Sequence, residues 1–153
     1  KKNGYLCSEE IVRDLTLKKR DEGIDQYFLK DPLAFSIKLF NLRLKEYNKI
    51  FNSNLIIYDR GPIDVLAYLN FKSIEIPKDL INDSKKINYE YSFILNPWRD
   101  IYTQDSIRYE SYEECVLIHE FLIKEYEKFK IKLIVVPNGT IIERVRFIKK
   151  FLD

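Results

Sequence analysis

The sequence predicts an α/β fold in which helices cover both faces of a parallel sheet. Short β-rich runs alternate with longer helical patterns, which is typical of stacked βα units. The clearest of these runs are continuously apolar, as expected for parallel strands that are buried on both faces. The 153 residues contain no internal repeat and no linker that would split the chain. We therefore expect one domain over residues 1–153.

Four segments are candidate strands. Residues 4–7 are too short to assign on pattern alone. Residues 55–58 are a better candidate because they form a continuous apolar run, and residues 91–95 are another candidate. Residues 132–136 give the most secure strand, because β-branched side chains dominate it. The order of these segments along the chain fits a sheet built from successive βα units.

A long helix is predicted to begin at Asp31-Pro32. Aspartate is a favoured N-cap, and proline is tolerated at the first helical position because its missing N–H would have no partner there. After this start, apolar residues recur every three or four positions and predict one inward face, formed by Leu33, Ile37, Phe40, Leu44, Tyr47 and Phe51.

Other helices follow from similar signals. Gly61-Pro62 begins a short helix, and the polar insertion of residues 72–90 contains one weak helix over residues 78–87. Ser111-x-x-Glu114 has the form of a capping box. The helix that it opens has a predicted inward face of Cys115, Ile118, Leu122, Tyr126 and Phe129. The closing helix has a predicted inward face of Ile141, Val145, Ile148 and Leu152.

The composition excludes several classes of protein. A chain that is 33% charged and 46% hydrophobic is globular rather than disordered. No apolar run approaches the roughly 18–20 residues that a membrane-spanning helix needs. Two cysteines form no disulfide framework, so a cytoplasmic location is expected. The 26 Lys and Arg residues nearly balance the 24 Asp and Glu residues, which argues against a nucleic-acid partner.

Carboxylates and arginines follow the candidate strands, at the edge where open parallel α/β sheets bind ligands. The sharpest feature is Asp59-Arg60, directly after residues 55–58. P-loop proteins hold Mg²⁺ with an acidic residue at such a position, and the arginine offers a planar fork for phosphate oxygens. The alternative is that Asp59-Arg60 only caps the helix that begins at Gly61.

Two further segments carry candidate residues. Glu9 and Glu10 could supply a general base, or could be acidic residues in the first turn of a helix. Residues 96–110 are long for a connection and have the length of a lid that brings Arg99 and Arg108 over a phosphate site. The alternative for this segment is a packed loop with solvated charges.

The histidine and cysteine residues do not indicate a metal or nucleophile site. His119 is the only histidine, and no cysteine lies at ligand spacing from it, so a structural role is expected rather than a zinc site. Cys7 and Cys115 lack a catalytic context and are expected to be small core residues.

Several groups of residues occur in order along almost the whole chain and resemble a known family. They are Glu10-x-x-Arg13, then Tyr58-Asp59-Arg60-Gly61-Pro62-x-Asp64-x-x-Ala67-Tyr68, then Pro97-Trp98-x-x-x-Tyr102-x-x-Asp105-x-x-Arg108, then Tyr126, Val136-Pro137 and Arg144. With this ordered set the chain resembles the small AAA-domain P-loop ATPases, compact kinase-like proteins akin to the ribosylnicotinamide kinase domain. The resemblance implies a five-stranded parallel sheet of P-loop kinase type, binding of ATP and Mg²⁺, and phosphoryl transfer or ATP hydrolysis.

The resemblance also implies roles for individual residues. Asp59 takes the Mg²⁺ position, and Glu10 occupies the place where the similar deoxynucleoside kinases keep a base. The catalytic roles fall to Glu10, Asp59, Arg60 and Arg108, and the contacts with the nucleotide to Arg13, Arg99 and Arg108. The resemblance also suggests that the phosphoryl acceptor, if the protein is a kinase, is a small molecule of nucleoside or nucleotide type.

The chain departs from the family pattern at one point. Such proteins open with a strand and a G-x-x-x-x-G-K-[ST] loop, whose backbone N–H groups and lysine cradle the phosphates. None of the four glycines precedes a Lys-Ser or Lys-Thr pair, and residues 1–5 resemble the end of the helix after that loop. We therefore expect the domain to be N-terminally incomplete, without its first strand and Walker A loop. In the family's 2-3-1-4-5 order, that strand lies between residues 55–58 and 91–95.

Three readings of function follow, and the near-zero net charge argues against one of them, nucleic-acid binding through surfaces rich in Lys and Tyr. Two remain. The first is an ATPase or small-molecule kinase that acts in the full-length protein, with a nucleotide and a small-molecule substrate as its partners. The alternative is a catalytically inactive P-loop-like domain that acts as a protein-interaction module, with another protein or a second copy of the chain as partner.

Overall fold

The computed structural model describes residues 4–8, 11–12, 15, 27–49, 55–103 and 110–152. The contacts divide the chain into two compact units, Lys1–Ser84 and Lys85–Asp153, and each unit is described by itself. The division falls inside residues 72–90, the segment that the sequence marks as a polar insertion. The organisation as one domain stays a prediction.

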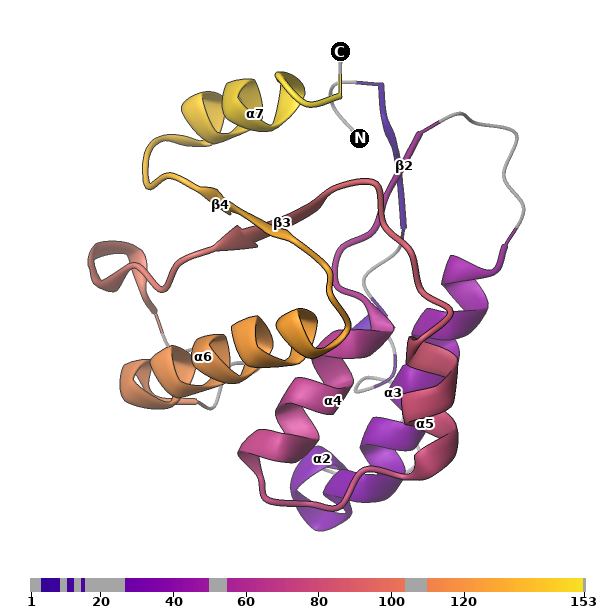
Figure 1. Ribbon diagram of the computed structural model, residues 1–153. Helices are drawn as coiled ribbons and strands as arrows, with labels where there is room; N and C mark the ends of the chain where they lie inside the picture. Colours follow the sequence, from indigo (N-terminus) through magenta and orange to yellow (C-terminus); the bar gives the residue numbers. More distant parts are fainter. Residues whose placement is uncertain are drawn as a thin grey trace. The chain divides into compact units, whose positions relative to one another are not determined.

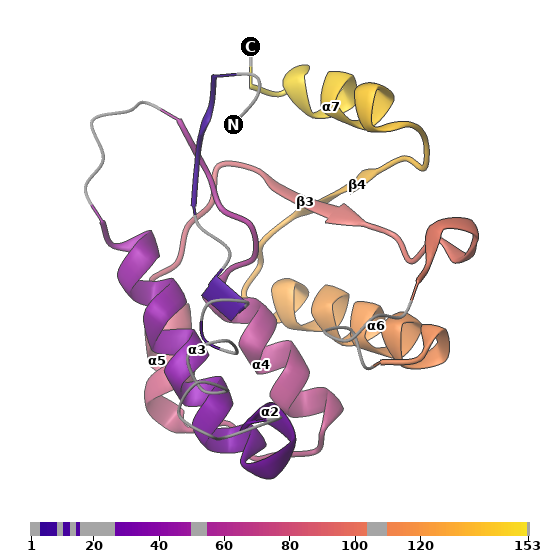
Figure 2. The same cartoon turned by 180° about the vertical axis from the view of Figure 1, so that it is seen from behind.

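The first unit combines a short parallel strand pair with helices (Figure 1). Strand β1 (Leu6–Cys7) pairs with β2 (Ile56–Ile57), with Leu6 opposite Ile56. The helices α2, α3, α4 and α5 span Tyr27–Lys30, Pro32–Tyr47, Pro62–Phe71 and Lys78–Ser84. Helices α3 and α4 lie side by side in both views (Figures 1 and 2). Both predicted strands are present, and α5 is shorter than predicted because it ends at Ser84.

The predicted start of α3 is confirmed. The Asp31 carboxylate accepts a hydrogen bond from the Ala34 backbone N–H at 2.9 Å, and Pro32 takes the first helical position. Helix α4 supplies a large part of the core of this unit, because six of its ten residues are buried. Its fully buried residues include Ile63, Leu66, Ala67 and Leu69.

The buried face of α3 differs from the predicted one. Its buried residues are Phe35, Ser36, Leu39, Phe40 and Arg43, and only Phe40 belongs to the predicted face. Leu33, which was predicted to face inward, is exposed. The apolar pattern was misleading because Ser36 and Arg43, two polar residues, lie on the inward side.

The second unit is also built from parallel strands and helices. Strand β3 (Ser92–Leu95) pairs with β4 (Leu133–Val136), with Leu95 opposite Val136. A 3₁₀ turn, η1, spans Arg99–Ile101, and the helices α6 and α7 span Tyr112–Lys128 and Ile141–Lys149. Helices α6 and α7 lie on opposite sides of the strand pair (Figures 1 and 2). The protein therefore has the predicted α/β fold with parallel strands.

Reciprocal caps fix the starts of both helices in the second unit. Ser111 Oγ accepts from the Glu114 N–H at 3.1 Å, and the Glu114 carboxylate accepts from the Ser111 N–H at 2.9 Å. Thr140 and Glu143 repeat the arrangement at the start of α7. The capping box predicted at Ser111 is thus confirmed.

The predicted inward faces of α6 and α7 are confirmed only in part. Tyr126 is buried, and the other predicted residues of α6 are half-buried. In α7, Val145 and Ile148 are half-buried, but Ile141 is 72% exposed and was wrongly predicted to face inward. The first turn of α7 therefore presents apolar surface that the strand pair does not cover.

The strands that the structure describes form two separate parallel pairs, β1·β2 and β3·β4. These are the pairs that the resemblance predicts for strands 2 and 3 and for strands 4 and 5 of the family order.

Candidate functional site

The turn after β2, formed by Asp59-Arg60-Gly61, is held to the end of β1. The Ser8 backbone N–H donates to the Ile57 carbonyl at 2.9 Å and continues the parallel pairing. The Ser8 hydroxyl oxygen in turn accepts a hydrogen bond from the Asp59 backbone N–H at 3.0 Å. Ser8 itself is buried. The carboxyl ends of the two strands are thereby fastened to each other at the candidate site.

The far side of the turn is held by α3 and α4. The Gly61 N–H donates to the Asp64 carboxylate at 2.5 Å, and Arg43 Nη1 donates to the Gly61 carbonyl at 3.1 Å. The Asp64 carboxylate lies 3.9 Å from the same Arg43 nitrogen. Asp64 therefore caps α4, and the carboxylate of Asp59 is not needed for that purpose.

The side chains of Asp59 and Arg60 are exposed. Within the part of the chain that the structure describes, neither forms a hydrogen bond or ion pair through its side chain. Arg60 has a φ angle of 74°, in the left-handed region that costs a residue with a side chain about 1–2 kcal/mol. Such strain persists only where the surroundings determine the backbone, and it is frequent at functional sites.

The strain at Arg60 gives a testable prediction. Arg60→Gly should raise the free energy of unfolding by about 1 kcal/mol, because glycine adopts a φ of this sign without a Cβ clash. Arg60→Ala is the matched control, since it also removes the guanidinium but keeps the Cβ. Urea denaturation of both variants measures the difference, and equal stability of the two would show that the turn is not strained.

Arg99 lies in the second unit, in η1, and is already engaged there. It forms an ion pair with Glu113 of α6 at 2.8 Å, and its guanidinium carbon lies 4.6 Å from the centre of the Tyr112 ring. The hydrogen bond between Arg99 and Glu113 raises the pKa of Arg99 and lowers the pKa of Glu113. Both side chains of the ion pair are about two-thirds exposed. An exposed ion pair of this kind contributes little to stability.

Three of the predicted site residues, Glu10, Arg13 and Arg108, lie outside the described residues. The structure brings together Asp59 and Arg60, which are adjacent in the first unit, and places Arg99 in the second. The convergence of all six residues on one site therefore stays a prediction.

Tyr58, directly before the candidate turn, has a packing role. Its ring lies 5.9 Å from the Tyr47 ring, and its hydroxyl donates to the Tyr47 carbonyl at 3.4 Å. Burial, followed by the proximity of Tyr47 and Glu46, raises the pKa of Tyr58 above 10.0. The phenol therefore stays protonated at neutral pH and is no candidate for a general base.

His119 lies half-buried on α6 and gives a prediction about pH. Burial lowers the pKa of His119 below 6.5, and the nearby Glu120 only partly opposes this shift. The unfolded chain then binds more protons than the folded one, so stability should fall as the pH drops below about 6.5. Denaturation curves of wild type and His119→Gln between pH 5 and 8 test this. The same pH dependence in both proteins would contradict it.

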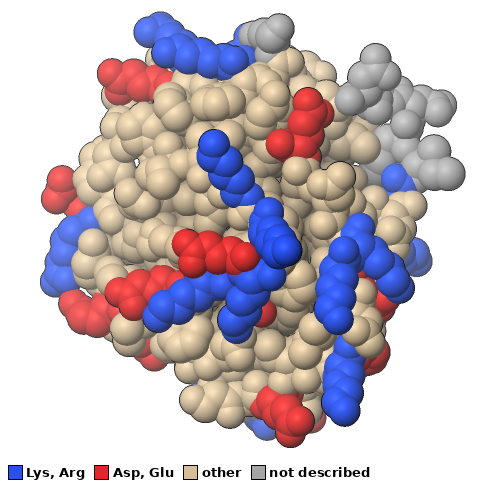
Figure 3. Space-filling view, viewed as in Figure 1, with Lys and Arg blue, Asp and Glu red and all other residues tan. Residues whose placement is uncertain are grey.

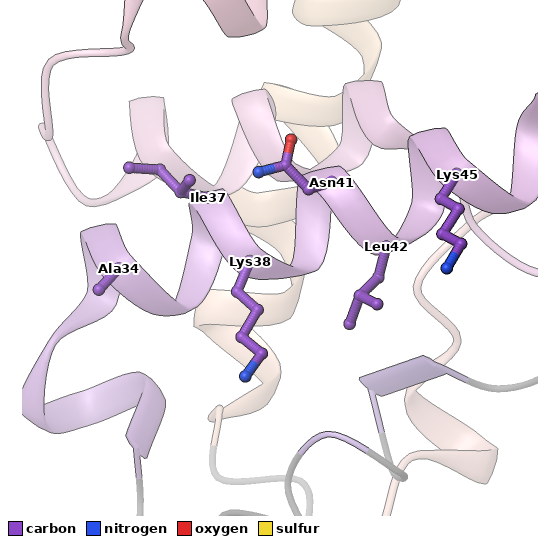
Figure 4. A pocket seen from close by; sticks show the side chains of 6 residues that line it. All are labelled: Ala34, Ile37, Lys38, Asn41, Leu42 and Lys45. Carbon is purple, nitrogen blue, oxygen red and sulfur yellow. The ribbon is translucent and has the colours of Figure 1, made fainter.

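A shallow hollow of about 480 Å³ lies along α3. Unlike the turn formed by Asp59-Arg60-Gly61, it is lined by no acidic residue. Lys38, Leu42 and Lys45 point to one side of the helix there (Figure 4). The lining residues are Ala34, Ile37, Lys38, Asn41, Leu42 and Lys45. They include no carboxylate, which is the side-chain ligand that Mg²⁺ and Ca²⁺ usually require. No group of three or more His, Cys, Asp or Glu residues forms a metal site among the described residues.

The surface and the helices bear on two of the other expectations. On the face shown in Figure 3, Lys and Arg side chains are interspersed with Asp and Glu side chains. None of the described helices is both long and apolar enough to span a membrane.

The contacts of Arg43, Ser8 and Asp64 with the turn were not predicted from the sequence. Asp64 lies three residues after Gly61, which is the spacing of a capping carboxylate and could have revealed its role. Arg43 gave no signal, because a single arginine in a helix is normally exposed.

Comparison with known proteins gives one match. A family model described as an AAA domain matches residues 1–144. No curated protein and no solved structure matches the chain significantly.

Proposed function

Because the chain belongs to the AAA domain family of P-loop NTPase-like proteins, we propose that it transfers the terminal phosphoryl group of Mg-ATP. The acceptor is a small molecule of nucleoside or nucleotide type, or water. The observation that carries this proposal is the exposed Asp59 carboxylate, two residues after the end of β2 and next to a guanidinium. Its side chain has no hydrogen-bond or ion-pair partner in the described part of the chain. We place the protein in the cytoplasm, since neither Cys7 nor Cys115 forms a disulfide.

The residues at the turn fit a magnesium ion. Mg²⁺ is usually held by one or two carboxylates together with substrate phosphates and water, rather than by a full set of protein ligands. Asp59 would be that carboxylate, and a single exposed aspartate is enough for this mode of binding. Bound there, Mg²⁺ would neutralise charge on the β- and γ-phosphate oxygens.

The arginines supply positive charge toward the phosphates. Arg60 directs a planar donor group from the same turn and would orient the transferred phosphoryl group. Arg99, Arg108 and Arg13 would bind the nucleotide. Arg99 must then leave Glu113 to bind a phosphate. The free energy needed to break this ion pair is small, because both side chains are exposed. Glu10 would accept the proton of the attacking hydroxyl.

The cradle for the phosphates is not encoded in these 153 residues, because they contain no G-x-x-x-x-G-K-[ST] loop. The proposal therefore requires that a segment outside them supplies it. In a sheet of the family order, this loop would follow a strand that lies between β2 and β3.

Titration calorimetry tests the proposal. A version of the protein extended ahead of Lys1 by a segment with this loop should bind ATP with a Mg²⁺-dependent heat. Asp59→Asn should remove the dependence on Mg²⁺ but retain part of the affinity for ATP. Binding of ATP with the same affinity with and without Mg²⁺ in the wild type would contradict the role of Asp59.

A protein-interaction module without catalytic activity is the second candidate. Its support is the pair of isoleucines at the start of α7, because Ile141 and Ile142 are 72% and 71% exposed. Large apolar side chains at adjacent exposed positions are typical of contact surfaces rather than of a solvated helix. The calorimetric experiment separates the two candidates, since this module should give no heat with ATP and Mg²⁺.

A further inference from the structure

Arg43 carries a buried charge, and the proposed function does not assign it a role. It lies in the middle of α3 and is only 7% exposed. Burial of a guanidinium is unfavourable unless hydrogen bonds and an opposite charge compensate for it. Arg43 Nη1 meets both conditions at the turn after β2, through the Gly61 carbonyl at 3.1 Å and the Asp64 carboxylate at 3.9 Å.

The contacts of Arg43 fall on the peptide groups next to the two candidate functional side chains. On one side of Arg60, the Asp59 N–H is fixed by Ser8. On the other side, the Gly61 N–H is fixed by Asp64 and the Gly61 carbonyl by Arg43. The backbone is therefore held before and after Arg60, whereas the side chains of Asp59 and Arg60 remain exposed.

We propose that Arg43 is a positioning residue, which acts through Gly61 and Asp64 to hold the turn that presents Asp59 and Arg60 to the nucleotide. This inference rests on the proposed function. Arg60 has a left-handed backbone conformation that its side chain disfavours, so the turn needs anchors to keep it. Arg43 holds the turn through the Gly61 carbonyl. Asp64, in the first turn of α4, faces the same guanidinium and so links Arg43 to that helix.

The guanidinium is suited to this task because it is planar and carries several donors. One group can donate to a carbonyl and face a carboxylate at the same time, which the compact ammonium of lysine does less well. Arg43→Lys should therefore keep the buried charge but hold the turn less firmly. Arg43→Met keeps an unbranched apolar side chain and removes every donor.

Amide hydrogen exchange tests the hold on the turn directly. Arg43→Met should speed exchange of the Asp59 and Gly61 amides by about tenfold, the effect of losing one or two hydrogen bonds, and Arg43→Lys by less. Lys45→Met is the matched control, because it removes an exposed charge from the same helix. Unchanged exchange at Asp59 and Gly61 in Arg43→Met would overturn the inference, whatever the protein does with nucleotide.

Turnover separates positioning from a loss of general stability. In a version of the protein that carries the phosphate loop, Arg43→Met should lower kcat about 10- to 100-fold with a smaller effect on KM. When Asp59 is already Asn, the same substitution should cost less than about threefold, since interacting residues are not additive. An equal loss in both backgrounds would overturn the positioning role.

The two proposals fail in different ways. If the wild type shows no Mg²⁺-dependent binding or turnover of ATP while Arg43→Met still loosens the turn, the proposed function is wrong, although Arg43 still anchors the turn. If Asp59→Asn abolishes turnover and Arg43→Met leaves the turn protected, the function stands and Arg43 has no positioning role.

Discussion

Asp59→Asn is expected to lower phosphoryl-transfer turnover by about two to three orders of magnitude in a version of the protein that carries the phosphate loop. The amide has nearly the shape of the carboxylate but no negative charge for Mg²⁺. A metal ion in such sites contributes several kcal/mol to transition-state stabilisation, and each tenfold loss in rate corresponds to about 1.4 kcal/mol. Release of ADP or of the phosphorylated product measures the effect.

A matched control exists in the same unit. Asp79→Asn makes the same change at an exposed aspartate in the first turn of α5 and should leave turnover within about twofold of wild type. Folding of Asp59→Asn should also be unaffected, because the Asp59 side chain forms no hydrogen bond or ion pair among the described residues. Wild-type turnover in Asp59→Asn would remove this residue from the mechanism.

Phe40→Ala should lower the free energy of unfolding of the first unit by about 3–5 kcal/mol, the usual cost of truncating a buried phenylalanine. Phe40 is completely buried on α3, the helix that packs against α4. The loss is comparable with much of the net stability of a typical domain, which is about 5–15 kcal/mol. Chemical denaturation followed by circular dichroism measures it.

Asn41→Ala serves as the control for this experiment. Asn41 follows Phe40 directly but is exposed, so its truncation should change stability by no more than about 0.5 kcal/mol. Similar losses for the two variants would mean that Phe40 is not packed as the structure shows. The experiment also tests the corrected face of α3, because Leu33→Ala, at a position that is 36% exposed, should cost less than Phe40→Ala.

The order of elements could be predicted from the sequence because its signals are local. The aspartate and proline at the start of α3, the capping box at Ser111 and the apolar runs of the strands each act within a few residues. The resemblance implied a five-stranded order, which stays a prediction, and the parallel pairs β1·β2 and β3·β4 are consistent with it. The family was also identified from the ordered motifs, and the match over residues 1–144 confirms it.

The inward face of α3 and the anchors of the turn could not be predicted, because they depend on distant partners. Arg43 is compatible with burial only through Gly61 and Asp64, about twenty positions along the chain. The partner of Arg99 was missed for a similar reason, since Glu113 belongs to a different element. The hydropathy of a residue reflects its transfer out of water. It does not indicate which hydrogen-bond partner the residue will find in the folded protein.

The hydrogen bonds around Asp59 and Arg60 have a thermodynamic consequence. The backbone of this turn loses its conformational freedom when the chain folds, before any ligand arrives. A cation or phosphate that binds there has only the torsions of two side chains left to restrict. The entropic penalty of binding is therefore smaller than at a loop that orders around its ligand.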